Sequence, residues 1–289
     1  MMKWIFALNA ASVDSYGDFA RVAIVSAKRY SSLQAVCLFD GEESQFTVWL
    51  REQGVEVVRV RSRFYDDIVR LAKARDVPPW VRIGTGAFLR LEIPRLAREL
   101  GWADEFVFYT DCDVMFERDP RPLLEPLRPR LFCAAPETFS NKPLHMNTGA
   151  MWMNLRTLDD PDFEVWTRRN MEKCLDFAFD QGAMRAFYNP PHRLAWRLGV
   201  PNSPFYGVMS RLPFQTWKWE NLPLELNWKP YWGPNPQACV IHFHGLKPTQ
   251  RAELAAGQLP PFIAQMHTPF FDECAARWDE LLKEARSDD

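Results

Sequence analysis

Short apolar runs alternate with amphipathic segments along the first third of the chain. The apolar runs have the length of buried β-strands and cover residues 4–8, 35–39, 55–60 and 106–109. Between them, apolar side chains recur with helical spacing over residues 18–30, 45–53, 66–75 and 83–100. This alternation is typical of βαβ units. We therefore predict an α/β fold with a largely parallel central sheet and helices on both faces, in which Pro94 kinks or divides the helix at 83–100.

The strand at 106–109 leads into Asp111-Cys112-Asp113, a D-x-D motif. In an extended chain, side chains two residues apart point to the same side, so we expect the two carboxylates to face each other. A divalent cation between them would relieve their repulsion, and such ions take oxygen ligands from carboxylates and from substrate phosphates. The motif predicts a metal held for a diphosphate-bearing substrate. The alternative is that one aspartate caps the following turn.

Three polar residues, Asn9, Asp40 and Asp111, each stand at the end of a predicted strand. The carboxyl ends of parallel strands meet at one edge of a sheet, and ligands of such sheets bind at that edge. The position of the D-x-D motif therefore predicts a ligand site there.

The second half of the chain has a less regular pattern. We predict strands at 131–135, 146–155 and 238–243, with a polar turn opening the second of them, and helices at 162–179, from 180 onwards and at 271–286. A charged surface connection rich in proline is expected at 118–130. Residues 190–261 hold 12 of the 23 prolines and five of the 12 tryptophans. Long irregular segments inside a domain are usually functional, so we expect these loops to serve binding.

Composition limits the class of protein. With 289 residues and 47% hydrophobic side chains, the chain can form one large domain. A net charge of -2 and dispersed Lys and Arg argue against a nucleic-acid partner. No apolar run approaches the length of a transmembrane segment, and the N-terminal run is too short for a signal peptide. The six cysteines stand singly, which favours free thiols and a cytoplasmic location.

Five separated segments match one family pattern. They are Arg90-Leu91, Phe108 to Asp113, Met146 to Gly149 with Asn154-Leu155, Asp180-Gln181, and His242 to Gly245 with Lys247-Pro248. In their order and spacing, the chain resembles the retaining glycosyltransferases of family 8, which include glycogenin and lipopolysaccharide galactosyltransferases and have the GT-A fold. The resemblance covers most of the chain. It implies a single GT-A domain over 1–289, with a nucleotide-sugar-binding half at 1–116 and an acceptor half at 117–289.

The resemblance also implies a reaction and its partners. A hexose would move from UDP-glucose or UDP-galactose to a hydroxyl of a carbohydrate acceptor, a glycan or glycolipid, with retention of configuration. The cofactor would be Mn²⁺, with Mg²⁺ as the alternative, bound by Asp111, Asp113 and His242. The other residues expected around the nucleotide sugar are Ala7, Asn9, Asp14, Arg90, Cys112, Gly245 and Lys247.

Three residues are expected to act at the sugar. Asn147 and Gln181 would hydrogen-bond sugar hydroxyls or the anomeric region, and Asp180 would accept from hydroxyls. Turn and helix-capping roles are the alternatives for this group. His242 and His244 alternate along a strand, so both lie on one face and either could reach the metal.

Basic and aromatic side chains complete the expected site. Lys247 would balance charge on the departing diphosphate, with a solvated surface lysine as the alternative. Arg90 would hold the aspartates or a phosphate in a bidentate grip, with an ordinary salt bridge as the alternative. The tryptophans of the loops would either stack on an acceptor sugar or pack in the core. They are Trp196, Trp217, Trp219, Trp228 and Trp232.

The chain departs from the family pattern in three places. In the first loop, extra residues separate Asn9 from Asp14 and Tyr16. The last segment is one residue short before Lys247. Gly182 stands where the family often has an acid, and its presence favours attack from the face of the departing group over a covalent intermediate.

Two other functions compete with glycosyl transfer. A sugar nucleotidyltransferase would need a glycine-rich phosphate loop after its first strand, and residues 7–11 have no glycine. A non-catalytic carbohydrate- or nucleotide-sugar-binding protein would not need the intact acids and histidine. Metal-dependent hydrolysis of a UDP-sugar would separate this last alternative from an enzyme.

Overall fold

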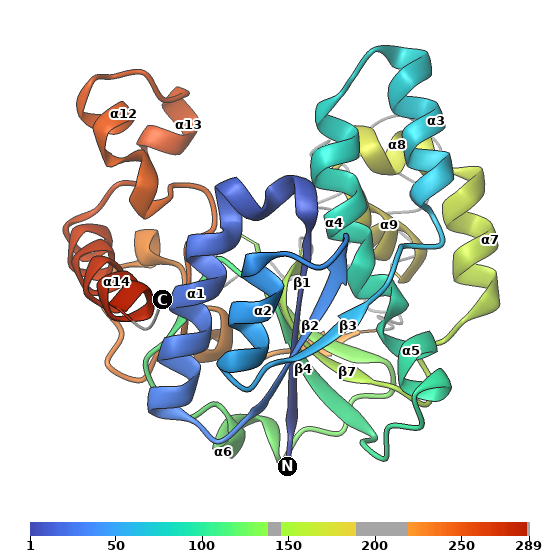
Figure 1. The fold of residues 1–289 in the computed structure, drawn as a ribbon, viewed down its shortest axis with the longest axis horizontal. Coiled ribbons are helices and arrows are strands. Elements are labelled where there is room, and N and C mark those ends of the chain that lie inside the picture. Colours follow the sequence, from blue (N-terminus) through green and yellow to red (C-terminus); the bar gives the residue numbers. More distant parts are fainter. Residues whose placement is uncertain (138–145, 189–218, 288–289) are drawn as a thin grey trace, which may run out of the picture.

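The computed structural model describes residues 1–137, 146–188 and 219–287. Its centre is a seven-stranded sheet with the strand order β3-β2-β1-β4-β7-β6-β8, covered by helices on both faces (Figure 1). The strands are β1 (Lys3–Asn9), β2 (Gln34–Asp40), β3 (Glu56–Arg59), β4 (Phe106–Thr110), β6 (Phe132–Pro136), β7 (Met146–Asn154) and β8 (Glu220–Asn221). The predicted α/β fold with a mostly parallel sheet is confirmed. β7 differs because it runs antiparallel to β4 and β6.

The apolar runs of the sequence are explained by two core layers, one on each face of the sheet. Alternate residues of β1 divide between them: Trp4 and Phe6 belong to one hydrophobic cluster and Ile5 to the other. A strand covered on both faces has no polar positions in its centre, which is why these runs read as continuous.

Different helices supply the two layers. The layer with Trp4 is completed by α1 (Val13–Tyr30), α2 (Gln45–Glu52), α6 (Arg121–Leu124) and α14 (Pro269–Ser287). The layer with Ile5 is completed by α3 (Tyr65–Arg75), α5 (Ile93–Glu99), α7 (Pro161–Arg169), α8 (Met171–Asp176) and α9 (Phe179–Tyr188). The helical pattern of the sequence therefore corresponds to faces buried against the sheet.

Several predicted boundaries are wrong for local reasons. α1 begins five residues earlier than predicted because a 3₁₀ turn, η1 (Ala10–Ser12), leads directly into it. The helix predicted at 162–179 is two helices, α7 and α8, with a break at Asn170, and α9 starts at Phe179 after a positive-φ residue, Ala178. The turn predicted at the start of the 146–155 segment belongs to β7, and a register shift between Ala134 and Ala135 absorbs the irregularity.

The segment before β4 is divided, as the proline predicted. It consists of a π-helical turn η2 (Trp80–Gly84), α4 (Thr85–Ala87), a 3₁₀ turn η3 (Phe88–Glu92) and α5. Pro94 stands in the first turn of α5, where a missing N–H leaves no hydrogen bond unmade. This broken path carries Arg90 to the carboxyl end of β4.

A second, two-stranded sheet lies beyond the end of β4. It pairs β5 (Val114–Phe116) with β9 (Val240–His242) in antiparallel orientation. The connections around it are short helical turns: η4 (Leu224–Asn227), η5 (Pro230–Trp232), η6 (Pro248–Gln250), α12 (Arg251–Ala255) and α13 (Pro261–Ala264). The strand predicted at 238–243 is thus confirmed as β9, and it belongs to this small sheet.

The cysteines agree with a further prediction. All six cysteines are buried and free. None of the helices in the described ranges is sufficiently long and apolar to cross a lipid bilayer.

Candidate functional site

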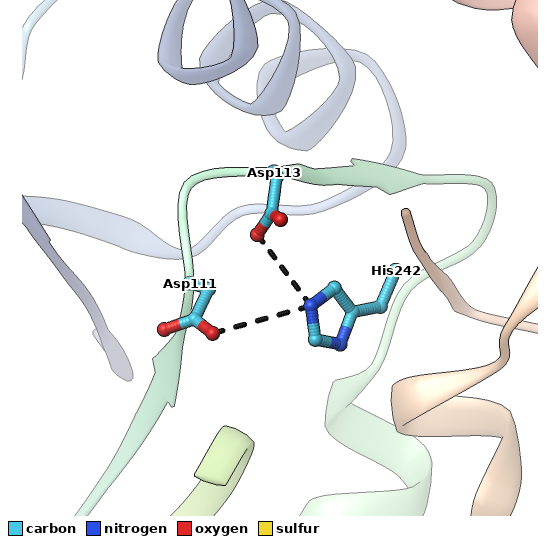
Figure 2. A group of neighbouring side chains, drawn as sticks. All are labelled: Asp111, Asp113 and His242. Carbon is cyan, nitrogen blue, oxygen red and sulfur yellow. Dashed lines mark ion pairs between the residues drawn. The ribbon is translucent and has the colours of Figure 1, made fainter. Parts of the chain in front are cut away.

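Two aspartates and a histidine meet just after β4. Figure 2 shows the side chains of Asp111, Asp113 and His242 turned toward one another. The Nε2 atom of His242 lies 3.5 Å from Oδ1 of Asp113 and 4.0 Å from Oδ2 of Asp111. One ligand atom from each residue lies within 4.8 Å of the others. Two carboxylate oxygens and an imidazole nitrogen at this spacing form a donor set for a divalent cation.

The backbone reaches this arrangement differently from the prediction. β4 ends at Thr110, and the chain bends through Asp111 to Asp113 before β5 starts at Val114. The bend, and not an extended D-x-D, turns both carboxylates to one site. The pairing of Val114 with His242 in the small sheet brings in the third group.

Asp111 is held through one of its two oxygens. Arg90 Nη2 donates to Asp111 Oδ1 at 2.8 Å, and the Tyr109 hydroxyl donates to the same oxygen at 3.0 Å. Arg90 also pairs through Nε with Asp180 at 2.8 Å. Burial would lower the pKa of the Arg90 guanidinium, but Asp111 and Asp180 outweigh it and raise that pKa. Arg90 is therefore a fixed cation between two carboxylates, and Oδ2 of Asp111 is left facing His242.

Asp113 is ionised by its neighbours. Burial alone would raise the pKa of this carboxyl, but Lys247 and His242 hold the pKa well below its usual range. Lys247 Nζ donates to Asp113 Oδ2 and to the carbonyl of Phe243. The preceding turn needs Gly245, whose φ of +83° is left-handed.

The two candidate histidines have different surroundings. The Nδ1 atom of His242 lies 2.8 Å from Oδ1 of Asn227, and its Nε2 faces the aspartates. The ring of His244 lies instead between Glu137, at 3.7 Å from its Nε2, and the hydroxyl of Tyr231, at 3.0 Å from its Nδ1. His242 is the imidazole that joins the D-x-D aspartates.

The candidate catalytic residues form one buried hydrogen-bonded group between α9 and β7. Gln181 Oε1 accepts from Asn147 Nδ2 at 3.1 Å and from the Thr148 amide at 2.9 Å. Asp180 accepts from the Thr148 hydroxyl at 3.3 Å as well as pairing with Arg90. Burial raises the pKa of Asp180 to about 6. The charge of Arg90 lowers this pKa only in part, and the charge of Asp111 raises it further.

A pocket of about 240 Å³ opens beside the aspartates. Residues predicted at the nucleotide sugar that line it are Ala7, Asn9, Arg90, Asp111, Cys112 and Asp113. Asp14 is not among them, because the first turn of α1 directs it to a separate groove of about 510 Å³ with Asp18 and Arg21. Tyr16, two residues further along, lines the 240 Å³ pocket.

Asn9 has one unsatisfied atom at this pocket. Its Nδ2 donates to the Arg82 carbonyl at 2.8 Å and to Thr85 Oγ1 at 2.7 Å. Its Oδ1 is buried and has no hydrogen-bond partner within residues 1–137, 146–188 and 219–287. Because buried acceptors are nearly always paired, this oxygen is an unsatisfied polar atom of a residue that lines the pocket.

The predicted tryptophans have several fates. Trp228 and Trp232 pack edge to face with their centroids 5.2 Å apart, and Trp219 is buried in the core. Trp196 and Trp217 lie outside the described residues. In the described part of the loops, packing is thus the observed role.

Sequence reasoning missed Asn227, Glu137 and Tyr109. The aromatic run of β4 gave Tyr109 a core role, and nothing around Asn227 or Glu137 marked either residue. Both become neighbours of the site only through pairing of distant strands.

Comparison with known proteins gives the fold. No protein-family model and no curated protein sequence matches the chain. The galactosyltransferase LgtC, solved with donor and acceptor sugar analogues, superposes with a TM-score of 0.55 at 15% identity, over 98% of this chain and 96% of that one. The bifunctional glycosyltransferase WbbM superposes with a TM-score of 0.50 at 15% identity, over 92% of this chain and 51% of that one.

The glycosyltransferase GlyE of Streptococcus pneumoniae TIGR4 has a TM-score of 0.48 at 14% identity, and 98% of this chain matches about 63% of its length. The resemblance read from the motifs is confirmed at the level of the fold. The chain has the mostly parallel α/β architecture of the GT-A glycosyltransferases, like those of family 8.

Proposed function

We propose that this protein is a metal-dependent, retaining glycosyltransferase that moves a hexose from a UDP-sugar to a hydroxyl of a carbohydrate acceptor. The observation that carries the proposal is the cluster of Asp111, Asp113 and His242 beside a 240 Å³ pocket on a GT-A sheet. A diphosphate in that pocket would meet the cluster at the carboxyl end of β4, where such sheets bind ligands.

The donor set fits a divalent ion of the Mn²⁺ type. Mg²⁺ is bound mainly by oxygen, whereas imidazole and carboxylate together suit Mn²⁺ and similar metals. When bound, such an ion supplies Lewis-acid stabilisation of the leaving diphosphate. Asp113 is kept ionised for this role by Lys247, and Arg90 and Tyr109 fix the rotation of Asp111.

The protein's own cations stabilise the charge that develops on the leaving group. Lys247 Nζ pairs with Asp113, and Asp113 lines the 240 Å³ pocket. A fixed cation beside a departing diphosphate contributes in the transition state, because the charge there is larger than in the bound donor. Arg90 contributes indirectly by holding Asp111 and Asp180.

The base is proposed to be recognised by Asn9. Its free Oδ1 needs an N–H donor, and its Nδ2 is already occupied. Uracil offers an imide N–H between two carbonyls, whereas cytosine offers only an acceptor at that position. Tyr16 lines the same pocket and supplies an aromatic surface for a base.

The sugar is proposed to lie toward Asn147, Asp180 and Gln181. Their buried group adjoins the candidate metal ligands, Asp111, Asp113 and His242. The contacts run through Arg90 and Asn227. Gln181 Oε1 is held by Asn147 and the Thr148 amide, and the neighbouring Gly182 offers no carboxylate, which supports attack from the face of the departing group.

Glycosyl transfer is tested by incubating the protein with Mn²⁺ and a panel of nucleotide sugars, and measuring release of the nucleoside diphosphate. We expect release from a UDP-hexose, and loss of release in Asp111→Asn and with a chelator. Tight UDP-sugar binding without turnover on any donor or acceptor would contradict the proposal and favour a non-catalytic binding protein.

A further inference from the structure

Asn227 connects the candidate metal ligand His242 to the candidate catalytic group. Neither its sequence context nor the motifs marked it as a site residue. Its side chain is fully buried, at 0% exposure. Its Oδ1 lies 2.8 Å from His242 Nδ1, and its Nδ2 donates to Asn147 Oδ1 at 3.0 Å. The contacts continue through Gln181, whose Nε2 donates to Glu137 Oε1 at 2.9 Å. Three amide side chains thus run from an imidazole to a carboxylate.

Two backbone amides, which can only donate, set the direction of the hydrogen bonds along this row of side chains. The Gly149 N–H lies 3.1 Å from one atom of the Asn147 amide, so that atom is the oxygen. The Thr148 N–H fixes Gln181 Oε1 in the same way at 2.9 Å. Since Asn147 presents an oxygen to Asn227, the group of Asn227 that faces it is the NH₂.

The orientation of Asn227 then decides the state of the histidine. With its NH₂ toward Asn147, Asn227 presents its oxygen to His242, and only a protonated Nδ1 can hydrogen-bond to it. The neutral ring then has a lone pair on Nε2, the atom that faces Asp111 and Asp113. Without Asn227, those two carboxylates would draw the proton to Nε2 and block it as a ligand.

We propose that Asn227 is a positioning residue that fixes His242 as the Nδ1–H tautomer, and that Asn147 and Gln181 hold Asn227 in the orientation this requires. The importance of the tautomer for metal binding rests on the proposed function. The tautomer itself does not, because it follows from hydrogen bonds within the protein. Gly149 serves the same end, since a Cβ there would overlap the His242 ring and Asn147 Oδ1.

The inference is tested by NMR of protein labelled with ¹⁵N-histidine, without metal, at about pH 9, where an ordinary imidazole is neutral. Long-range ¹H–¹⁵N spectra distinguish the two tautomers, and the signals of His242 are those absent from His242→Gln. The variants are Asn227→Leu, which removes the acceptor, and Asn227→Asp, which keeps an oxygen for Nδ1. Asn154→Leu is the matched control, because Asn154 is buried on β7 and bonded through both its amide atoms.

We expect the Nδ1–H tautomer in the wild type, in Asn154→Leu and in Asn227→Asp, and the Nε2–H tautomer in Asn227→Leu. Isothermal titration with Mn²⁺ should show a loss of affinity of about 10–100-fold in Asn227→Leu. A purely structural role would make Asp as harmful as Leu, because an aspartate places an acceptor against Asn147.

An Nε2–H tautomer in the wild type, or an unchanged tautomer in Asn227→Leu, would overturn the inference. Absence of Mn²⁺ binding by the wild type would contradict the proposed function, and the NMR spectra would still decide the tautomer. The two failures are therefore distinguishable.

Discussion

The two sides of the candidate site are built in different ways. Asp111 and the 240 Å³ pocket belong to the parallel part of the sheet, where β1 and β4 are covered on both faces. His242, Asn227 and Lys247 come from a segment of short 3₁₀ turns and a three-residue strand. The first side is fixed by the central core, and the second by pairing between β5 and β9 and by buried polar contacts. The site therefore joins a sheet-built half to a loop-built half, and changes in the two halves should have different signatures.

The largest effect is expected at Asp113, which lines the pocket and pairs with residues of the loop-built half. Asp113→Asn removes the charge that pairs with Lys247 and His242. We expect activity to fall by at least about 10³-fold, at the upper end for the loss of one electrostatic group in an active site. Steady-state assays with the active UDP-sugar measure it. Asp119→Asn, a surface aspartate paired with Arg121, is the control and should keep full activity.

A smaller effect is expected where the two halves meet. Gln181→Ala removes the amide that holds Asn147 and leaves Glu137 with one donor fewer. We expect kcat to fall by about 10²-fold with little change in KM, because a dipole that acts on developing charge contributes mainly in the transition state.

Restoration of activity toward the wild-type level by Gln181→Glu would indicate that a carboxylate can replace the amide at the sugar. Gln53→Ala, at the end of α2, is the matched control for loss of a glutamine. A kcat near that of the wild type in Gln181→Ala would place the start of α9 outside the active site.

The packing of the loop-built half is tested by Gly149→Ala. The added Cβ would overlap the imidazole of His242, so we expect a loss of about 1–3 kcal/mol in the free energy of unfolding, as for other overpacked sites, together with weaker Mn²⁺ binding. Gly17→Ala is the control, because Gly17 lies in α1 with only ordinary contacts around its position, and alanine favours helix. Denaturant unfolding measures both. Equal stability and equal Mn²⁺ affinity in Gly149→Ala would show that His242 does not pack there.

The pH dependence of stability should report Asp180. Burial raises its pKa to about 6, so the folded protein holds this proton more tightly than the unfolded chain. The stabilisation is complete below the ordinary aspartate pKa and is lost as pH rises through about 6. Between pH 7 and pH 4.5 we expect Asp180 to contribute about 2 kcal/mol of added stability on acidification.

Asp180→Asn should lose this increment, which is measured as the difference between wild type and variant in unfolding free energy at the two pH values. The substitution also changes the contact with Arg90, and part of that effect is the same at both pH values. This part cancels when the difference at one pH is subtracted from the difference at the other. A wild-type protein that gains no stability over Asp180→Asn on acidification would show that Asp180 is ionised throughout.

The same contrast explains what the sequence could predict. β1, β2 and β4 could be predicted from their apolar runs, because a strand that is buried on both faces is apolar along its whole length. Asp111 and Asp113 were predicted from their place after such a run. Asn227 and Glu137 were not, because their chemistry arises only when residues some 15 to 44 positions away pack against them. Asp14 lines a separate groove, because the 3₁₀ turn at residues 10–12 leads directly into α1 and places Asp14 in its first turn.

The central claim is that a divalent ion held by Asp111, Asp113 and His242 and the adjacent 240 Å³ pocket together bind a nucleoside diphosphate. It is tested most directly by the melting temperature of the protein with UDP, with and without Mn²⁺. We predict that UDP at about 100 times its Kd raises Tm by about 4–5 °C only when Mn²⁺ is present. The increment should vanish in the Asp111→Asn/Asp113→Asn double variant and persist in Asp279→Asn, a surface control paired with Arg251. An equal shift without Mn²⁺, or an undiminished shift in the double variant, would contradict the account.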